Sequence, residues 1–262
     1  SGTAAELNAA LTETAENAWT LSVTGAVSAS DLIALAGKTA VAVDAVAVTS
    51  LTGSPAEVQA LYALGMSELT GLGNEPVTLT GPVTATQAQD VAALTTGMVT
   101  ASIEADTASA LVAALQVEAV ANDYTLTVFG AATAADLNTL AGLTSVPVNI
   151  AGVTSISGDL ADLGLINTGA FEGRGDEAIT VTDGTITAAE ATTALGWTTG
   201  VVTATVATDS AAALNGALTS ASGSDALTLT VTGTATAADL IALAGKTSVA
   251  VDATGLNNIN GT

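Results

Sequence analysis

Apolar residues recur in two alternating patterns from the start of the chain. Ala4–Ala15 carries leucines at i, i+4 spacing, which predicts a helix, and Thr20–Thr24 alternates apolar and polar residues, which predicts a strand. The order then repeats, with a helical pattern over Ala29–Ala36 and a strand pattern at Val41–Val43. The chain therefore reads as a series of coils, each with one helix followed by one strand.

The coils belong to a longer repeat. Asp31–Asp44 returns almost unchanged as Asp239–Asp252, with Asp136–Asn149 as a looser copy between them. A second series interleaves with the first, because Gly71–Thr78 matches Gly173–Thr180. A fixed period of this kind is the sequence signature of a repeat architecture.

We divide the chain into five repeats of about fifty residues, each holding two coils. Their bounds are 4–53, 54–104, 105–158, 159–208 and 209–261. Consecutive strands joined by a crossover helix are expected to pair in parallel. The prediction is one α/β solenoid of about ten helix–strand coils with a parallel β-sheet, similar to leucine-rich repeats, and the chain is expected to be a piece of a longer array.

Helix-capping signals support this division. A Ser or Thr followed three residues later by an acid or amide marks a helix start. The predicted pairs are Thr3/Glu6, Ser28/Asp31, Ser54/Glu57, Thr86/Gln89, Thr133/Asp136, Thr187/Glu190 and Thr236/Asp239. Glycines follow four of the second helices and predict left-handed C-caps, at Gly37, Gly142, Gly196 and Gly245.

Composition and charge narrow the picture. Apolar residues make up 49% of the chain but aromatic residues only 2%, which predicts a thin core of Ala, Val and Leu. The chain has three basic residues and 25 acidic residues, which gives a net charge of −22. Nucleic acid is therefore excluded as a partner, since binding it requires Lys and Arg on phosphates. The scattered acids are expected to form a solvated face.

The absence of Cys and His removes most catalytic chemistry. Disulfides, thiolate or imidazole metal sites, Cys nucleophiles and Ser-His-Asp triads are all excluded. Lys38 and Lys246 are repeat equivalents, whereas catalysis needs a unique site, so we expect no enzyme. No apolar run is long enough to cross a bilayer, so no membrane insertion is expected in this stretch, and any export signal is expected outside it.

Two motifs are candidates for binding. Asp44, Asn149 and Asp252 share one repeat position just after a strand, where aligned oxygen ligands could bind Ca²⁺, although Asp or Asn is also ordinary turn chemistry there. Arg174–Asp176 spells an Arg-Gly-Asp tripeptide. Because Leu72–Asn74 takes its place one repeat series earlier, we interpret it as a turn rather than a receptor motif.

Several segments carry a family resemblance, namely Val48–Val58, Leu69–Thr78 and Ala134–Ala141. They resemble repeats of the very large, Thr/Ala-rich cell-surface and secreted proteins of marine cyanobacteria and other marine bacteria. The resemblance implies an extended filament or coat component, with roles in motility, adhesion or defence and often a Ca²⁺-containing environment. It supplies no catalytic residues.

The leading functional hypothesis is a structural spacer at the cell surface or outside the cell. Its expected partners are neighbouring repeats of the same longer chain, with no cofactor apart from possible Ca²⁺. The alternative is an adhesin that binds a surface glycan or another copy of itself. A polysaccharide-degrading solenoid enzyme would need acids and cations clustered in one repeat, and the sequence has no such cluster.

Overall fold

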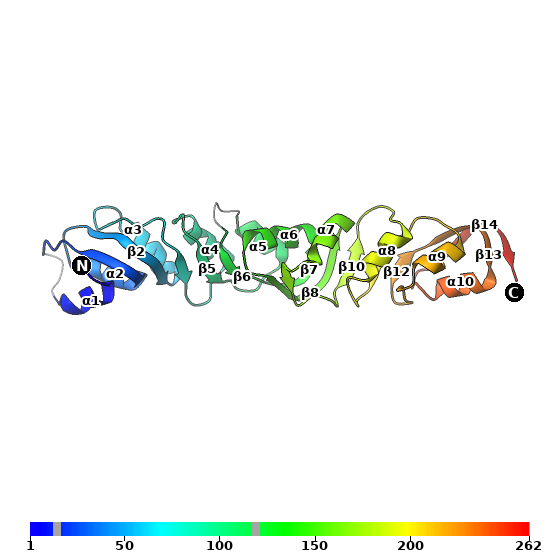
Figure 1. Cartoon of the computed structure of the whole chain (residues 1–262), viewed down its shortest axis with the longest axis horizontal. Coiled ribbons are helices and arrows are strands. Elements are labelled where there is room, and N and C mark those ends of the chain that lie inside the picture. The colour runs from blue at the N-terminus through cyan, green and yellow to red at the C-terminus, as the bar shows by residue number, and fades with distance from the viewer. Residues whose placement is uncertain (13–16, 117–120, 262) are drawn as a thin grey trace. The chain divides into compact units, whose positions relative to one another are not determined.

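The structure is a computed structural model that describes residues 1–12, 17–116 and 121–261. Helices and strands alternate along the described chain (Figure 1). Contacts divide the chain into two compact units. The first comprises 1–106, 110–127 and 140–147, and the second comprises 107–109, 128–139 and 148–262. Each unit is an α/β structure with parallel strands, which confirms the predicted class.

The helices are short. Those of the described residues are α1 (Ala4–Ala10), α2 (Ala29–Ala36), α3 (Pro55–Ala63), α4 (Ala85–Ala92), α5 (Ala108–Ala114), α6 (Ala134–Leu143), α7 (Leu160–Ile166), α8 (Ala188–Leu195), α9 (Ala211–Ala217) and α10 (Ala237–Ala244). Isolated helices of this length are unstable in water, so their stability comes from capping and from packing against the strands.

The strands pair in parallel throughout, as predicted. They are β1 (Ser22–Ser28), β2 (Val43–Gly53), β3 (Leu69–Thr70), β4 (Val77–Leu79), β5 (Val99–Ser102), β6 (Asp123–Thr125), β7 (Thr127–Thr133), β8 (Val148–Gly158), β9 (Phe171–Glu172), β10 (Ala178–Val181), β11 (Val202–Thr205), β12 (Ala226–Thr228), β13 (Thr230–Thr236) and β14 (Asp252–Asn260). The sheet orders are β1-β2-β4-β5-β6 and β12-β11-β10-β8-β7, with β3 beside β2, β9 beside β8, and a separate β13-β14 pair. Each strand thus pairs with strands of neighbouring coils in the chain.

The core is thin and aliphatic. In the first unit Leu32 of α2 and Leu51 of β2 are fully buried, and in the second unit Leu137 and Val148 are buried on α6 and β8. Burial of each such side chain contributes about 1.5–3 kcal/mol. Because a single coil supplies only one helix and one or two strands, each coil needs its neighbours to complete this core.

Two long strands, β2 and β8, each pair with two short strands of the next coil. The start of β2 pairs with β3 and its end with β4, and β8 pairs with β9 and β10 in the same way. Between the two short strands the chain passes close to the long one at Gly71, where a Cβ would lie 2.5 Å from Val46 Cγ2. Gly173 lies in the same way against Ala151, at 2.6 Å. Both glycines also have positive φ, so no other residue fits these positions without strain.

Most predicted N-caps are confirmed. Thr3, Ser54 and Thr187 form complete capping boxes with a glutamate three residues on, and Pro55 occupies the first turn of α3 as expected. The side-chain oxygens of Ser28, Thr133 and Thr236 each accept a hydrogen bond from the N–H three residues later.

The predicted cap Thr86/Gln89 is wrong. Helix α4 begins two residues earlier, with Thr84 and Gln87 as a complete capping box. Both threonines have a Gln three residues later, so the local pattern fits either register. The parallel bridge between Val83 and Ile103 decides between them, because it leaves Thr84 extended directly before the helix.

The predicted left-handed C-caps are also wrong. Gly37, Gly196 and Gly245 have φ of −69°, −81° and −76°, and Gly142 lies inside α6 without positive φ. After α2 the chain continues into one more right-handed turn, in which Lys38 N–H donates to Leu35 O, so no reversal is needed.

The first helix is shorter than predicted. It ends at Ala10 instead of Ala15, because Leu11 is extended, and residues 13–15 of the predicted helix lie outside the described residues. None of the helices in the described ranges is long and apolar enough to cross a membrane.

Candidate functional site

The three residues predicted to bind Ca²⁺ make the same local hydrogen bond. Asp44, Asn149 and Asp252 each accept a hydrogen bond at Oδ1 from the backbone N–H two residues later, at 3.1, 3.0 and 2.9 Å. Hydrogen bonds from the backbone and side chain of Thr254 lower the pKa of Asp252. Each side chain therefore makes an Asx hydrogen bond within its own long strand, β2, β8 or β14. Directly after Asp44 and Asp252 the pairing register shifts, as at a β-bulge.

The structure places different neighbours around these residues. Asp44 pairs in register with Ser22 and Thr70. Within the second unit, Asn149 pairs with Glu172, whereas Asp252 pairs with Thr230 of a separate sheet. In the described ranges no three His, Cys, Asp or Glu residues come together as a metal site. Calcium binding stays a prediction, which a calcium-dependent rise in melting temperature would support.

The Arg-Gly-Asp tripeptide lies in the turn between β9 and β10. Gly175 N–H donates to Glu177 Oε2 at 2.9 Å, and its equivalent in the first unit, Gly73 N–H, donates to Glu75 Oε2 at 2.8 Å. Gly73 and Gly175 have almost the same positive φ, 132° and 131°. Both turns are therefore built in the same way around a glutamate side chain, which agrees with their interpretation as turns.

These two glutamates are the most deeply buried acids of the turns, each only 3% exposed. In the first unit, Tyr62 donates its hydroxyl to Glu75 Oε1. Burial raises the pKa of Tyr62 well above its usual value, and the hydrogen bond and the charge of Glu75 add to the rise. In the second unit, Glu177 Oε1 has no hydrogen-bond partner.

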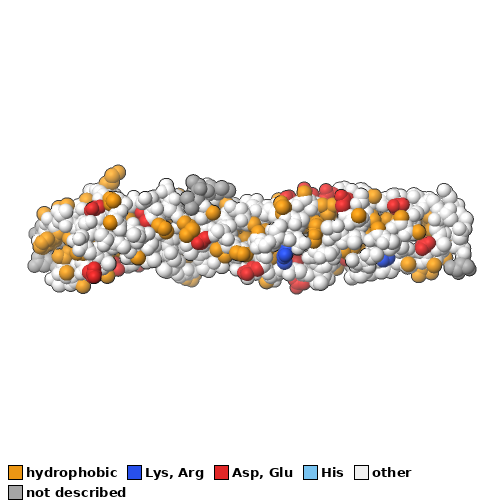
Figure 2. Space-filling model, viewed as in Figure 1, with side chains coloured by type: hydrophobic (Ala, Val, Ile, Leu, Met, Phe, Trp, Pro, Cys, Tyr) orange, Lys and Arg blue, Asp and Glu red, His pale blue; other side chains and the backbone are white. Residues whose placement is uncertain are grey.

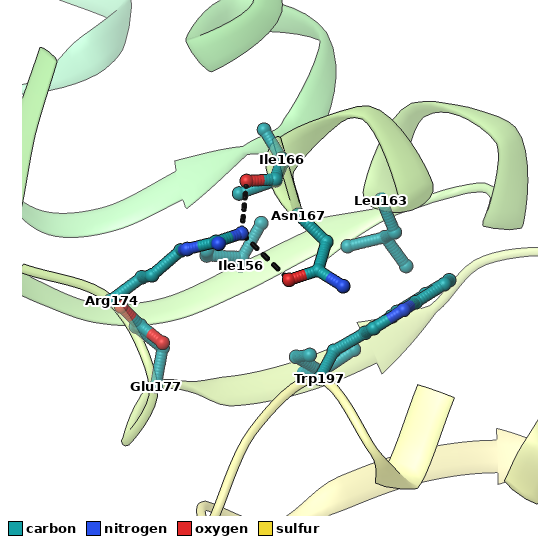
Figure 3. A pocket seen from close by; sticks show the side chains of 8 residues that line it. Ile156, Leu163, Ile166, Asn167, Arg174, Glu177 and Trp197 are labelled. Atoms are coloured by element: carbon teal, nitrogen blue, oxygen red, sulfur yellow. Dashed lines mark hydrogen bonds between the residues drawn. The ribbon is translucent and has the colours of Figure 1, made fainter. Parts of the chain in front are cut away.

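A small pocket adjoins Glu177 (Figure 3). Arg174 and Asn167 meet on one side of it, where Arg174 Nη1 donates to Asn167 Oδ1 at 2.7 Å, and Trp197 lies across from them. Its volume is about 20 Å³, which is room for one water molecule and for no organic ligand. The pocket is thus a packing feature of the turn rather than a substrate site.

All three basic residues of the chain bind the ends of helices. Lys38 Nζ donates to Asn8 O and Leu11 O at the end of α1, at 2.6 and 2.7 Å. Lys246 Nζ donates to Leu218 O at the end of α9, and Arg174 Nη1 to Ile166 O at the end of α7. Cations at helix C-termini satisfy free carbonyls and interact well with the helix dipole. These residues are therefore explained by structure without an anionic ligand.

A repeated threonine joins neighbouring coils, and the sequence analysis missed it. In each repeat its hydroxyl donates to a backbone carbonyl of the preceding coil at 2.6–3.0 Å and accepts the N–H two residues later. We call these residues the threonine staples: Thr39, Thr95, Thr144, Thr198 and Thr247. Their recurrence at one position of every repeat was the available signal.

The site residues thus make hydrogen bonds within the fold, in strands, at helix ends and between coils. Asp44, Asn149 and Asp252 accept backbone hydrogen bonds within their strands. The basic residues bind helix ends, and the threonine staples join neighbouring coils. Comparison with family models, with curated proteins and with solved structures finds no match to this chain.

Proposed function

We propose that this chain is a structural spacer, a repeat segment of a large cell-surface or secreted protein. About ten helix–strand coils stack in it as one solenoid of the leucine-rich-repeat type, and the chain is not an enzyme. Its role is to give length and continuity between other parts of a longer protein. The resemblance to giant Thr/Ala-rich surface proteins supports the location, and the comparisons neither add to it nor argue against it.

The threonine staples are the observation that carries this proposal. The same side chain makes the same inter-coil hydrogen bonds once in each of the five repeats, from Thr39 to Thr247. A binding or catalytic protein concentrates unusual residues at one place, whereas a spacer repeats one junction along its length. The repetition of the junction therefore favours a spacer.

The surface chemistry agrees with this proposal. Acidic side chains are dispersed over the visible faces of the units, with few basic ones among them (Figure 2). Many acids are explained by local structure, as with Glu6, Glu57 and Glu190 in capping boxes. A dispersed negative charge keeps an apolar repeat soluble and separates neighbouring molecules.

Insertion of extra repeats tests the proposal. A second copy of residues 54–158, placed between residues 158 and 159, adds two repeats at a junction the chain already uses. We expect the maximum dimension in small-angle X-ray scattering to rise in proportion to the added coils while the cross-section stays constant. An unchanged length with a wider cross-section would contradict a spacer. Saturable glycan binding would favour the adhesin.

A further inference from the structure

The last coil of the described chain presents an apolar face that its equivalents bury. In the first unit Leu51 of β2 is fully buried, and in the second unit Ile156 of β8 is 3% exposed. Ile259 occupies the same position in β14 and is 55% exposed. The difference arises from the neighbours, because the three strands share one pattern.

The helix of that coil shows the same contrast. Residues Asp239–Lys246 of α10 and the following turn repeat the sequence Asp31–Lys38 of α2. Leu32 is fully buried, whereas its copy Leu240 is partly exposed, and Ile241 is 74% exposed. Figure 2 shows apolar side chains gathered near α10. The same sequence is therefore more buried in α2 than in α10. We interpret the surface formed by α10 and β14 as one that a neighbouring coil covers.

The equivalents show what covers such a face. β2 and β8 are each covered by a coil with one helix and two short strands, which we call a split-strand coil: α3 with β3 and β4, or α7 with β9 and β10. Within the described residues β14 pairs only with β13, so its other edge has no strand beside it. Backbone groups on such an edge pair readily with an added strand.

The close glycine contact makes the fit selective. Gly71 lies against Val46, and Gly173 lies against Ala151. Val46 and Ala151 each come two residues after the Asp or Asn near the start of their long strand. Thr254 is the residue at this position in β14. A coil that covers β14 therefore needs a glycine opposite Thr254, as both split-strand coils would supply.

We propose that the face of α10 and β14 binds a further split-strand coil, in the register that β2 uses for β3 and β4. The inference rests on the proposed stacking of coils and names the kind of coil that continues it. A folded second copy of the chain cannot supply such a coil, because its β4 and β10 are already paired on both sides. β4 lies between β2 and β5, and β10 lies between β8 and β11.

The test is a fusion of a second copy of residues 54–104 directly after Gly261 of the full chain. Hydrogen exchange measured by mass spectrometry should show protection in the copied α3, β3 and β4. Exchange of the β14 amides should slow by about 100-fold, because an edge strand that gains a neighbour opens only together with it. An unprotected extension with unchanged exchange in β14 would overturn the proposal.

Two matched substitutions in the appended copy test the register. Gly71 and Gly81 have nearly equal φ, +88° and +83°, but a Cβ at Gly81 meets nothing within 4 Å. We expect Gly71→Ala in the copy to abolish the protection of β14 and Gly81→Ala to retain it. Equal behaviour of the two variants would contradict the proposed register.

Two further outcomes separate this inference from its alternatives. If exchange in β14 of the unfused chain slows as its concentration rises, a second copy occupies the face and the proposal is wrong. If insertion of residues 54–158 lengthens the particle but the fused copy gains no protection from hydrogen exchange, the spacer function is supported. Only the proposal for what binds the face of α10 and β14 is then wrong.

Discussion

At the scale of single residues, small polar side chains do the joining in this chain. Thr144 is 8% exposed, donates to Tyr124 O at 2.8 Å and accepts Tyr124 N–H at 2.9 Å and Val146 N–H at 3.1 Å. One hydroxyl therefore satisfies three backbone groups at a junction between coils. A buried backbone group left without a partner costs about 1–3 kcal/mol.

The substitution Thr144→Val should accordingly destabilise the protein. Valine keeps the shape but removes the hydroxyl, so we expect the free energy of unfolding to fall by about 1–3 kcal/mol in denaturant titration. Thr154→Val, at an exposed position of β8, serves as the control and should change stability little. Equal effects of the two substitutions would contradict the role of the threonine staples.

Tyr62 tests the buried glutamate of the turn. Tyr62→Phe leaves Glu75 Oε1 without its donor, and we expect a loss of about 1–3 kcal/mol in the free energy of unfolding. Adding Glu75→Gln should recover part of this loss, because no buried carboxylate then remains. If the double variant loses as much free energy of unfolding as the two single variants together, the two side chains do not interact.

At the scale of the elements, the helix caps make the protein sensitive to acid. Hydrogen bonds from the backbone and side chain of Ser54 lower the pKa of Glu57 below its ordinary value of 4.5. A lowered pKa means that the cap contributes stability above the unfolded pKa and that this contribution disappears as pH falls through the folded one. The exchange protection of α3 should therefore decline as the pH falls below this ordinary value of 4.5 and through the lowered pKa of Glu57.

The substitution Glu57→Gln separates this effect from general acid unfolding. Glutamine also fits a capping box but does not titrate, so protection of α3 in the variant should depend less on pH over that range. Helix α4 provides an internal comparison, because its capping box already contains Gln87. If the pH dependence of α3 is the same in the variant and in the unmodified chain, the cap is not its source.

The elements also show what a sequence can and cannot predict here. The caps of α2 and α3 were predictable because Ser28 and Ser54 bond to groups three residues away. The start of α4 was misplaced because Thr84 and Thr86 give the same local signal, and only the pairing of Val83 chooses between them.

Junctions between coils were harder to predict than the elements themselves. The partner of Thr144 lies 20 residues away in sequence, and no local pattern marks it. The role of Lys38 was hidden for the same reason, since the carbonyls that it binds belong to the end of the preceding helix. The candidate calcium residues were predicted to follow a strand, whereas Asp44, Asn149 and Asp252 lie at or near the start of the long strands β2, β8 and β14. The hydrogen bonds that they make within these strands are visible only in the structure.

At the scale of the whole molecule, the central proposal is that the coils stack as one extended solenoid. The radius of gyration of the full chain in small-angle X-ray scattering tests it most directly. A compact domain of 262 residues would have a radius of gyration of about 18 Å. We predict a value well above this, with a rod-like scattering profile that does not change with concentration. A value near this compact limit would contradict the account.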